Sequence, residues 1–326
     1  MKALNRKIDL SEGVARDRIL ARVLVFTPKL KSAQQEALWG YLLISPWIIG
    51  FLGLVLFPML TALYLSLTEY SLLSSARFIG LQNYIDAFLH KDLFWKSLLI
   101  TFKYTAIMVP LNVGGSLAFA LLLNQRVRGI TVYRTLVFLP AIVPLVAAVL
   151  LWTMLFNQAF GPINYWLGKI GVTGPPWFAD SAWALPSLIL ITLWGGVGGT
   201  GCIMFLAALQ GIPQHLYEAV EIDGGNAWHK FRHITLPMLT PTTFMMLVIN
   251  VIMSFQSFAL PYVATRGGPS YATYFYGIYL YQEAFNHYRM GYASALAWIL
   301  FAILVVFTYY QFRTSRRWVY YEGEKL

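Results

Sequence analysis

The sequence is poor in charged residues and in cysteine, and both shortages exclude classes of protein. Charged residues make up 12% of the 326 residues, whereas 58% are hydrophobic and the mean hydropathy is +0.59. In soluble domains about a quarter of the residues are charged. The single cysteine, Cys202, excludes an intrachain disulfide framework and a metal site built from several cysteines. The composition therefore predicts an integral membrane protein.

Six segments are long and apolar enough to span a bilayer, at about 38–67, 97–123, 132–156, 184–208, 241–262 and 290–312. A membrane-spanning helix needs roughly twenty mainly apolar residues, and each segment satisfies that requirement. Pro140, Pro144 and the glycine-rich run 195–201 predict bends, which packed neighbours in a helix bundle tolerate. We therefore expect an all-α integral membrane fold with six transmembrane helices.

None of these segments contains Asp, Glu or His. Proton-coupled carriers normally keep titratable groups inside the membrane, where such groups are costly and are retained for function. Lys103 lies about six residues into its segment, and we expect its side chain to reach the outer interface. The sequence therefore argues against a proton-coupled carrier, although sodium coupling through backbone carbonyls stays open.

Sequence patterns of enzymes are also missing. His229 and His233 have the i, i+4 spacing of a metal-binding pair, but Lys230 stands where a zinc protease has its glutamate. The pair Gly168 and Lys169 lacks the preceding glycine and the following Ser or Thr of a phosphate-binding loop. We therefore expect that the chain is not an enzyme, and that it binds no metal or cofactor. Any ATP has to be used by a partner.

The basic residues are distributed unevenly between the two sides of the predicted membrane domain. If the N-terminus is inside, 17 Lys and Arg residues fall on the inner side and 6 on the outer side. The positive-inside rule then places both termini in the cytoplasm. The net charge of +10 is therefore explained by the excess of basic residues on the cytoplasmic side of the membrane, and nucleic acid is not an expected partner.

We therefore expect three parts in the chain. Residues 1–37 form a cytoplasmic N-terminal lead, 38–312 the transmembrane domain, and 313–326 a cytoplasmic tail. Within the transmembrane domain, a polar cytoplasmic loop at about 209–240 separates the fourth and fifth predicted spans.

This loop has the pattern of two short surface helices joined by a glycine turn. Polar residues recur on one face of the first helix at i, i+4 and i+7, namely Gln214, Glu218 and Glu221. Gly224 and Gly225 favour the left-handed conformation that ends a helix, and Asn226 is suited to cap the next one. On these residues alone, an ordinary interfacial connector explains the loop equally well.

The loop resembles the EAA loop of ABC importer permeases. The matching residues are Glu218-Ala219-Val220-x-x-Asp223-Gly224, followed by Ile234-x-Leu236-Pro237. Val220 and Gly225 depart from the family pattern, which usually has alanine at 220 and often has it at 225. The resemblance implies that the loop docks on an ATPase and that coupling depends on Glu218, Ala219, Asp223, Gly224, Ile234, Leu236 and Pro237.

The run TRGGPSYATYF at 265–275 and the residues around the loop resemble the carbohydrate-uptake branch, typified by maltose-type permeases, and the similarity covers roughly 38–320. It implies a permease subunit of an ATP-driven carbohydrate importer in the bacterial inner membrane. The implied partners are a second similar permease, two ATPase subunits and an extracytoplasmic solute-binding protein. The alternatives are an ABC permease for another solute, such as a glycerol phosphodiester, then a carrier or channel working alone, and last a membrane enzyme.

Uncharged polar and aromatic residues within the spans mark a candidate solute pathway, at Asn112, Trp194, Asn250, Ser254, Gln256 and Ser257. Asn250, Ser254 and Ser257 have the i, i+4, i+7 spacing of one helical face. Amides and aromatic rings suit a neutral sugar, which presents apolar faces and many hydroxyls. For any one of these residues, hydrogen bonding between helices is an equally good explanation.

Overall fold

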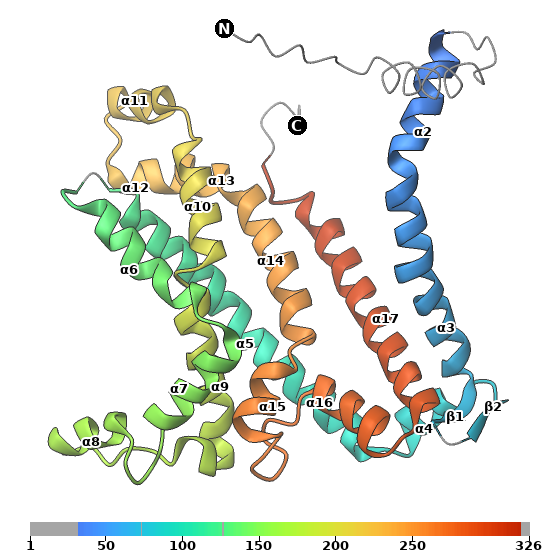
Figure 1. The fold of residues 1–326 in the computed structure, drawn as a ribbon. Helices are drawn as coiled ribbons and strands as arrows, with labels where there is room; N and C mark the ends of the chain where they lie inside the picture. The colour runs from blue at the N-terminus through green and yellow to red at the C-terminus, as the bar shows by residue number, and fades with distance from the viewer. Residues whose placement is uncertain (1–31, 73, 126, 321–326) are drawn as a thin grey trace, which may run out of the picture. The chain divides into compact units, whose positions relative to one another are not determined.

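The computed structural model describes residues 32–72, 74–125 and 127–320 (Figure 1). Contacts divide the chain into two units after Thr61. The N-terminal lead therefore lies largely outside the described residues. The first unit is helical, with the elements α2 (Ser32–Gly50), η1 (Phe51–Leu56) and the beginning of α3 (Phe57–Ser66). Together they form one apolar helical segment, Glu36–Ser66, of 31 residues. The wider turns of η1 directly precede Pro58, as is common where proline interrupts the helical hydrogen bonds.

After the end of α3, the second unit has a short hairpin that the sequence analysis did not predict. Strands β1 (Thr68–Ser71) and β2 (Ser74–Phe78) pair antiparallel, with Thr68 opposite Phe78 and Glu69 opposite Arg77. Helix α4 (Gln82–Leu89) follows, and Asn83 donates to the carbonyl oxygens of Ser66 and Thr68 at 2.8 and 2.9 Å. The fold is therefore mostly helical as predicted, with this hairpin as a small addition.

Helix α5 (Asp92–Leu123) is the central element of the second unit. It has 32 residues, Pro110 does not interrupt it, and it contacts α9 (Ser181–Gly196), α10 (Thr200–Gln210), α14 (Thr240–Phe255) and α16 (Tyr276–Tyr281). Small and polar residues lie on its buried face, including Ser97, Thr101, Asn112 and Ser116. Such residues allow close approach of helices within a membrane.

Two of the predicted spans are broken where proline and glycine predicted bends. Helices α6 (Ile130–Ile142) and α7 (Leu145–Leu155) meet at 95°, and α9 and α10 meet at 44°. Val143 is extended, with ψ of 126°, because the following Pro144 disfavours a helical conformation at 143. The connection between α7 and α9 carries α8 (Pro162–Lys169) and η2 (Trp177–Ala179).

The helix in the fifth predicted span ends before the apolar run does. Helix α14 ends at Phe255, and a separate helix α15 (Ala259–Thr265) follows the break at 256–258. The chain then continues through η4 (Gln282–Asn286) to α17 (Met290–Ser315). Among the described residues, three helices are long and apolar enough to cross a membrane, and counting each of three bent pairs as one span gives up to six.

The second unit has two distinct ends (Figure 1). Helices α11 (Gln214–Ile222), α12 (Ala227–Lys230) and α13 (Leu236–Met238), together with the C-terminal end of α17, lie at one end, which we call the loop end. The hairpin, α4, α8 and α15 lie at the other end, which we call the hairpin end. Between them, the buried core combines apolar residues of α5, α9, α10, α16 and α17.

Candidate solute pathway and coupling loop

The coupling loop contains the predicted arrangement of helix, glycine turn and helix. Helix α11 (Gln214–Ile222) ends in a turn at Gly224, whose φ of +76° is left-handed. The N–H of Gly225 donates to the carbonyl oxygen of Val220 at 2.8 Å, and the N–H of Gly224 donates to that of Glu221 at 3.0 Å. This pair of bonds is the Schellman arrangement, which satisfies carbonyls at a helix end. Glycine is favoured at 224 because it has no Cβ to oppose positive φ.

The second helix of the loop begins at the predicted cap. Asn226 accepts a hydrogen bond from the N–H of His229 at 3.0 Å, and the His229 ring faces the N–H of Asn226 at 3.4 Å. The helix continues through α12 (Ala227–Lys230), η3 (Phe231–Thr235) and α13 (Leu236–Met238), which has Pro237 in its first turn. The Tyr217 hydroxyl meets that of Thr235 at 3.0 Å and ties the two helices together.

The outer surface of the loop combines unpaired acids with apolar side chains. Glu221 forms an ion pair with Lys230, whereas Glu218 and Asp223 are exposed and have no partner in the part of the chain that the structure describes. Ile222 is 86% exposed and Trp228 is 60% exposed, on either side of the glycine turn. The sequence analysis did not single out these two residues, although large apolar residues beside a polar stripe were the available signal.

The remaining residues of the predicted EAA pattern divide between the surface and the interior. Ala219 and Leu236 are exposed, whereas Ile234 is partly buried against the core of the second unit. The loop therefore has an inner face that attaches it to the bundle and an outer face that is free to contact another protein.

A cavity of about 460 Å³ lies within the second unit, next to the bends of the third and fourth spans. Its volume is within the range typical of small-molecule sites. The lining residues come from six helices and the breaks beside them: Tyr104, Met108, Pro140, Ala141, Val143, Leu145, Ala148, Ile191, Thr192, Trp194, Gly195, Gly196, Asn250, Met253, Ser254, Ser257 and Leu260. None of these residues is charged.

Four of the six predicted pathway residues line this cavity, namely Trp194, Asn250, Ser254 and Ser257. Asn112 lies directly beside it and donates to Asn250 Oδ1 at 2.7 Å. The cavity also has a hydroxyl pair that we did not predict, because Tyr104 Oη lies 2.8 Å from Thr192 Oγ1. The wall therefore combines two aromatic residues, hydroxyls and an amide.

Gln256 is separated from the other predicted pathway residues. It is exposed and lines a different hollow beside α17, with Phe301 and Tyr309 among its neighbours. The reason is helical geometry, because Gln256 follows Asn250 by six residues and so lies about 120° away from it around the helix. Helix α14 ends at Phe255, and Ser257, in the break that follows, lines the cavity.

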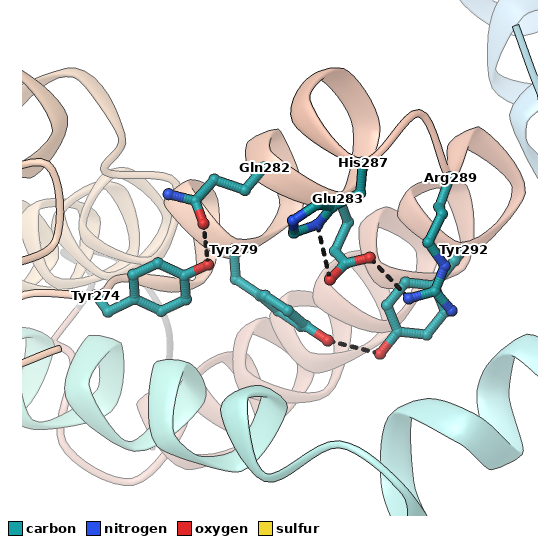
Figure 2. Close-up of polar contacts among 7 residues, drawn as sticks. All are labelled: Tyr274, Tyr279, Gln282, Glu283, His287, Arg289 and Tyr292. Carbon is teal, nitrogen blue, oxygen red and sulfur yellow. Dashed lines mark hydrogen bonds and ion pairs between the residues drawn. The ribbon is translucent and has the colours of Figure 1, made fainter.

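A buried polar cluster at the hairpin end fixes the connection into α17 (Figure 2). Glu283 is 6% exposed and lies 3.0 Å from Arg289 Nη1 and 3.4 Å from His287 Nδ1. Figure 2 also shows Tyr279 and Tyr292 joined through their hydroxyls at 2.8 Å. The sequence analysis did not assign these partners, although the i, i+4 spacing of Glu283 and His287 was an available signal.

The same cluster holds the segment that precedes α16. Tyr274 Oη donates to Gln282 Oε1 at 2.5 Å. Burial, together with the nearby Glu283 carboxylate and Tyr271, raises the pKa of Tyr274 to about 12. Tyr274 therefore remains a neutral hydrogen-bond donor at physiological pH.

Within the described ranges, no group of three or more His, Cys, Asp or Glu side chains is placed to hold a metal ion. The expectation that the chain binds no metal or cofactor stays a prediction.

Residues 112–319 match the family model of the binding-protein-dependent transport system inner membrane component. The chain belongs to this family. The matched region contains the coupling loop, the polar cluster and every cavity-lining residue except Tyr104 and Met108. The family assignment thus agrees with the resemblance found in the sequence.

Relatives of this permease match over nearly their whole lengths. It is 40% identical to the probable ABC transporter permease protein YesP of Bacillus subtilis, over 91% of this chain and 96% of the relative. It is 32% identical to the trehalose/maltose transport system permease protein MalF of Thermococcus litoralis, over 89% and 97%. Homologues that are transporter permeases fit a chain that is not an enzyme.

A solved structure has the same fold. The permease aligns with a chain of a bacterial alginate ABC transporter in complex with an alginate pentasaccharide-bound periplasmic protein, with a TM-score of 0.79 and 22% identity. The alignment covers 89% of this permease and 98% of that chain.

Proposed function

We propose that this permease is one of two membrane subunits of an ATP-driven importer for a neutral carbohydrate. The observation that carries the proposal is the uncharged cavity, whose wall brings Trp194, Asn250, Ser254 and Ser257 together. A sugar fits such a wall because its apolar C–H faces suit aromatic rings and its hydroxyls suit amides and other hydroxyls. The relative named as a trehalose/maltose transport system permease supports the same class of solute.

The coupling loop is the proposed attachment point for the ATPase. Ile222 and Trp228 are exposed apolar residues beside a rigid turn, and the unpaired Glu218 and Asp223 flank them. Exposed apolar groups rimmed by charges are typical of protein interfaces. The hydrogen bonds of the Gly224 turn hold these groups in a fixed geometry, which transmits a movement of the ATPase to α10 and α14.

The proposed orientation places the loop end and both termini in the cytoplasm, in the bacterial inner membrane. The asymmetry of 17 to 6 basic residues supports this orientation. The partners are then a second similar permease, two ATPase subunits at the loop end, and an extracytoplasmic solute-binding protein at the hairpin end. The ATPase subunits, rather than this chain, use ATP.

The cavity favours a neutral solute over a glycerol phosphodiester. A phosphodiester carries a negative charge, and proteins bind such groups with Arg, Lys or helix N-termini. No Lys, Arg or His lines the cavity in the described part of the chain.

A panel of solutes tests the proposal. The complex, purified with its partner subunits and reconstituted in proteoliposomes with the binding protein outside and ATP inside, is offered maltose, trehalose, sucrose, raffinose and glycerophosphocholine. We expect ATP-dependent uptake of at least one neutral sugar and none of glycerophosphocholine. Uptake of glycerophosphocholine alone, or uptake that needs neither ATP nor binding protein, would contradict the proposal.

A further inference from the structure

The floor of the cavity is a close contact between α5 and the glycine-rich bend of the fourth span. Next to the cavity, a Cβ placed on Gly196 would lie 2.8 Å from Asn112 Oδ1. One turn nearer the loop end, a Cβ on Gly201 would lie 2.7 Å from Ser116 Oγ and 2.6 Å from Met246 Cε. Any side chain at either glycine would therefore push the two helices apart. The floor closes only because both positions are glycine.

Two polar atoms at this floor are buried without a hydrogen-bond partner among the described residues, namely Asn112 Oδ1 and Ser116 Oγ. The orientation of Asn112 follows from its neighbour. Asn250 donates to the carbonyl oxygen of Met246 at 2.8 Å, so it presents Oδ1 to Asn112, and Asn112 has to offer its NH₂ group. The Asn112 oxygen then faces Gly196, which offers no side-chain donor.

Buried polar groups without partners are rare in folded proteins, because each one loses its hydrogen bonds to water on burial. An alanine at 116 would avoid that cost in the closed arrangement. Both unpaired groups lie on the buried face of α5, four residues apart, or about 6 Å along the helix axis. They therefore continue the line of polar groups from the cavity toward the loop end.

The segment that covers these two groups contains the bend of the fourth span. Helices α9 and α10 meet at 44° across 197–199, which lies between the two glycines that touch α5. Behind the bend, a Cβ on Gly199 would lie 3.0 Å from Ala141 Cβ in α6. The bend is thus packed between α5 and α6 with glycines at its closest contacts, and a change in its angle would separate it from α5.

We propose that Asn112 and Ser116 form a second solute-binding layer, which lies between the cavity and the loop end and is covered by the glycine bend at rest. We call it the lower layer. This inference rests on the function proposed above. When the bend leaves α5, Asn112 Oδ1 accepts a hydrogen bond from a sugar hydroxyl and Ser116 Oγ exchanges hydrogen bonds with the next one. The two groups then guide a neutral carbohydrate from the cavity toward the loop end.

The first test removes one of the unpaired groups. In the reconstituted complex, Ser116→Ala should lower the uptake rate of the best-transported neutral sugar by roughly 2- to 10-fold, the effect of one lost hydrogen bond. Its melting temperature should stay equal or rise, because the alanine leaves no unpaired hydroxyl. Ser97→Ala is the matched control, since Ser97 is on the same helix, is fully buried and donates to the carbonyl oxygen of Phe94 at 2.9 Å. It should keep normal uptake.

The second test follows exposure of the lower layer. A Ser116→Cys variant in a Cys202→Ala background is treated with a small maleimide, first without nucleotide and then after trapping with ATP and vanadate. We expect the introduced thiol to be protected at rest and to react in at least one nucleotide state.

The two tests together separate this inference from the function on which it rests. Normal uptake by Ser116→Ala, together with an introduced thiol that is protected in every state, would overturn the lower layer. The proposed importer function would still stand if the wild-type complex takes up sugar. Absence of sugar uptake by the wild-type complex would instead overturn the proposed function itself.

Discussion

Val220 and Gly225 are sterically complementary across the turn of the coupling loop. A Cβ at Gly225 would overlap Val220 Cγ1 and would lie 2.9 Å from the Val220 carbonyl oxygen. These are also the two positions at which the loop departs from the EAA pattern. The structure therefore links the two departures, because the larger side chain at 220 occupies space that an alanine at 225 would need.

The pair predicts a non-additive effect of substitution. Gly225→Ala alone should disturb the turn, at a cost typical of overpacking, about 1–3 kcal/mol. It should therefore weaken binding of the ATPase to the permease. Val220→Ala together with Gly225→Ala should recover part of that binding, since the side-chain overlap is removed. A double-mutant cycle of ATPase affinity measures the coupling, and strictly additive effects would contradict the steric link.

A second prediction concerns the left-handed turn at Gly224. Gly224→Val forces a β-branched residue to positive φ, which costs on the order of 1–2 kcal/mol and redirects the second helix. The variant should accumulate at a normal level, yet bind the ATPase poorly and transport little. Gly129→Val is the matched control, because Gly129 has φ of +77° against +76° for Gly224 and both have open space for a Cβ. Equal loss of uptake in both variants would show general strain and not a coupling role.

Glu218→Lys addresses the charge of the same loop. Glu218 is exposed and its side chain has no hydrogen-bond or ion-pair partner among the described residues, so the substitution should leave the melting temperature unchanged. If the carboxylate meets a basic group of the ATPase, charge reversal should reduce the ATPase affinity by roughly 10-fold or more. Unchanged affinity, measured at low salt, would remove Glu218 from the interface.

Much of this architecture follows from the sequence, for identifiable reasons. The six spans are long apolar runs, and the bends at Pro144 and at 195–201 are local consequences of proline and glycine. The end of α14 at Phe255 was not predictable, because the apolar run continues to Tyr262.

Long-range pairings were also beyond sequence reasoning. Asn112 and Asn250 are 138 residues apart, and either amide alone is consistent with a pathway or with helix packing. The hairpin at 68–78 has too few apolar residues to produce a strand pattern. Gln256 shows that the position around the helix determines which hollow a polar residue lines. It lies within the predicted segment but lines a different hollow from Ser257.

The pathway assignment predicts a contrast between Trp194 and Gln256. Trp194→Ala removes an aromatic wall of the cavity and should reduce sugar uptake by about 10-fold or more, the effect of losing a stacking partner. Gln256→Leu should retain most of the uptake, because Gln256 does not line that cavity. Uptake kinetics of both variants, compared at equal amounts of assembled complex, check the contrast. Loss of uptake in Gln256→Leu alone would move the pathway to the hollow beside α17.

The glycine bend predicts a difference in stability between two glycines. A Cβ on Gly198 would overlap the backbone carbonyl oxygen of Val137, whereas a Cβ on Gly114 meets nothing within 4 Å. Gly198→Ala should therefore destabilise the permease or prevent its assembly, since backbone cannot move aside as a flexible side chain does. Gly114→Ala should be neutral or stabilising within its helix. Thermal unfolding of the two variants in detergent is the measurement.

The central claim is that this chain is the permease of an ATP-driven importer and holds its ATPase through the loop around Gly224. The most direct measurement is the composition of the complex purified from its native membrane through a tag on the intact chain. We predict a second permease together with two ATPase subunits per complex, and, for Gly224→Val, retention of the second permease with loss of the ATPase. Purification of the wild-type chain alone, with solute transport by that chain in proteoliposomes without ATP, would contradict the claim.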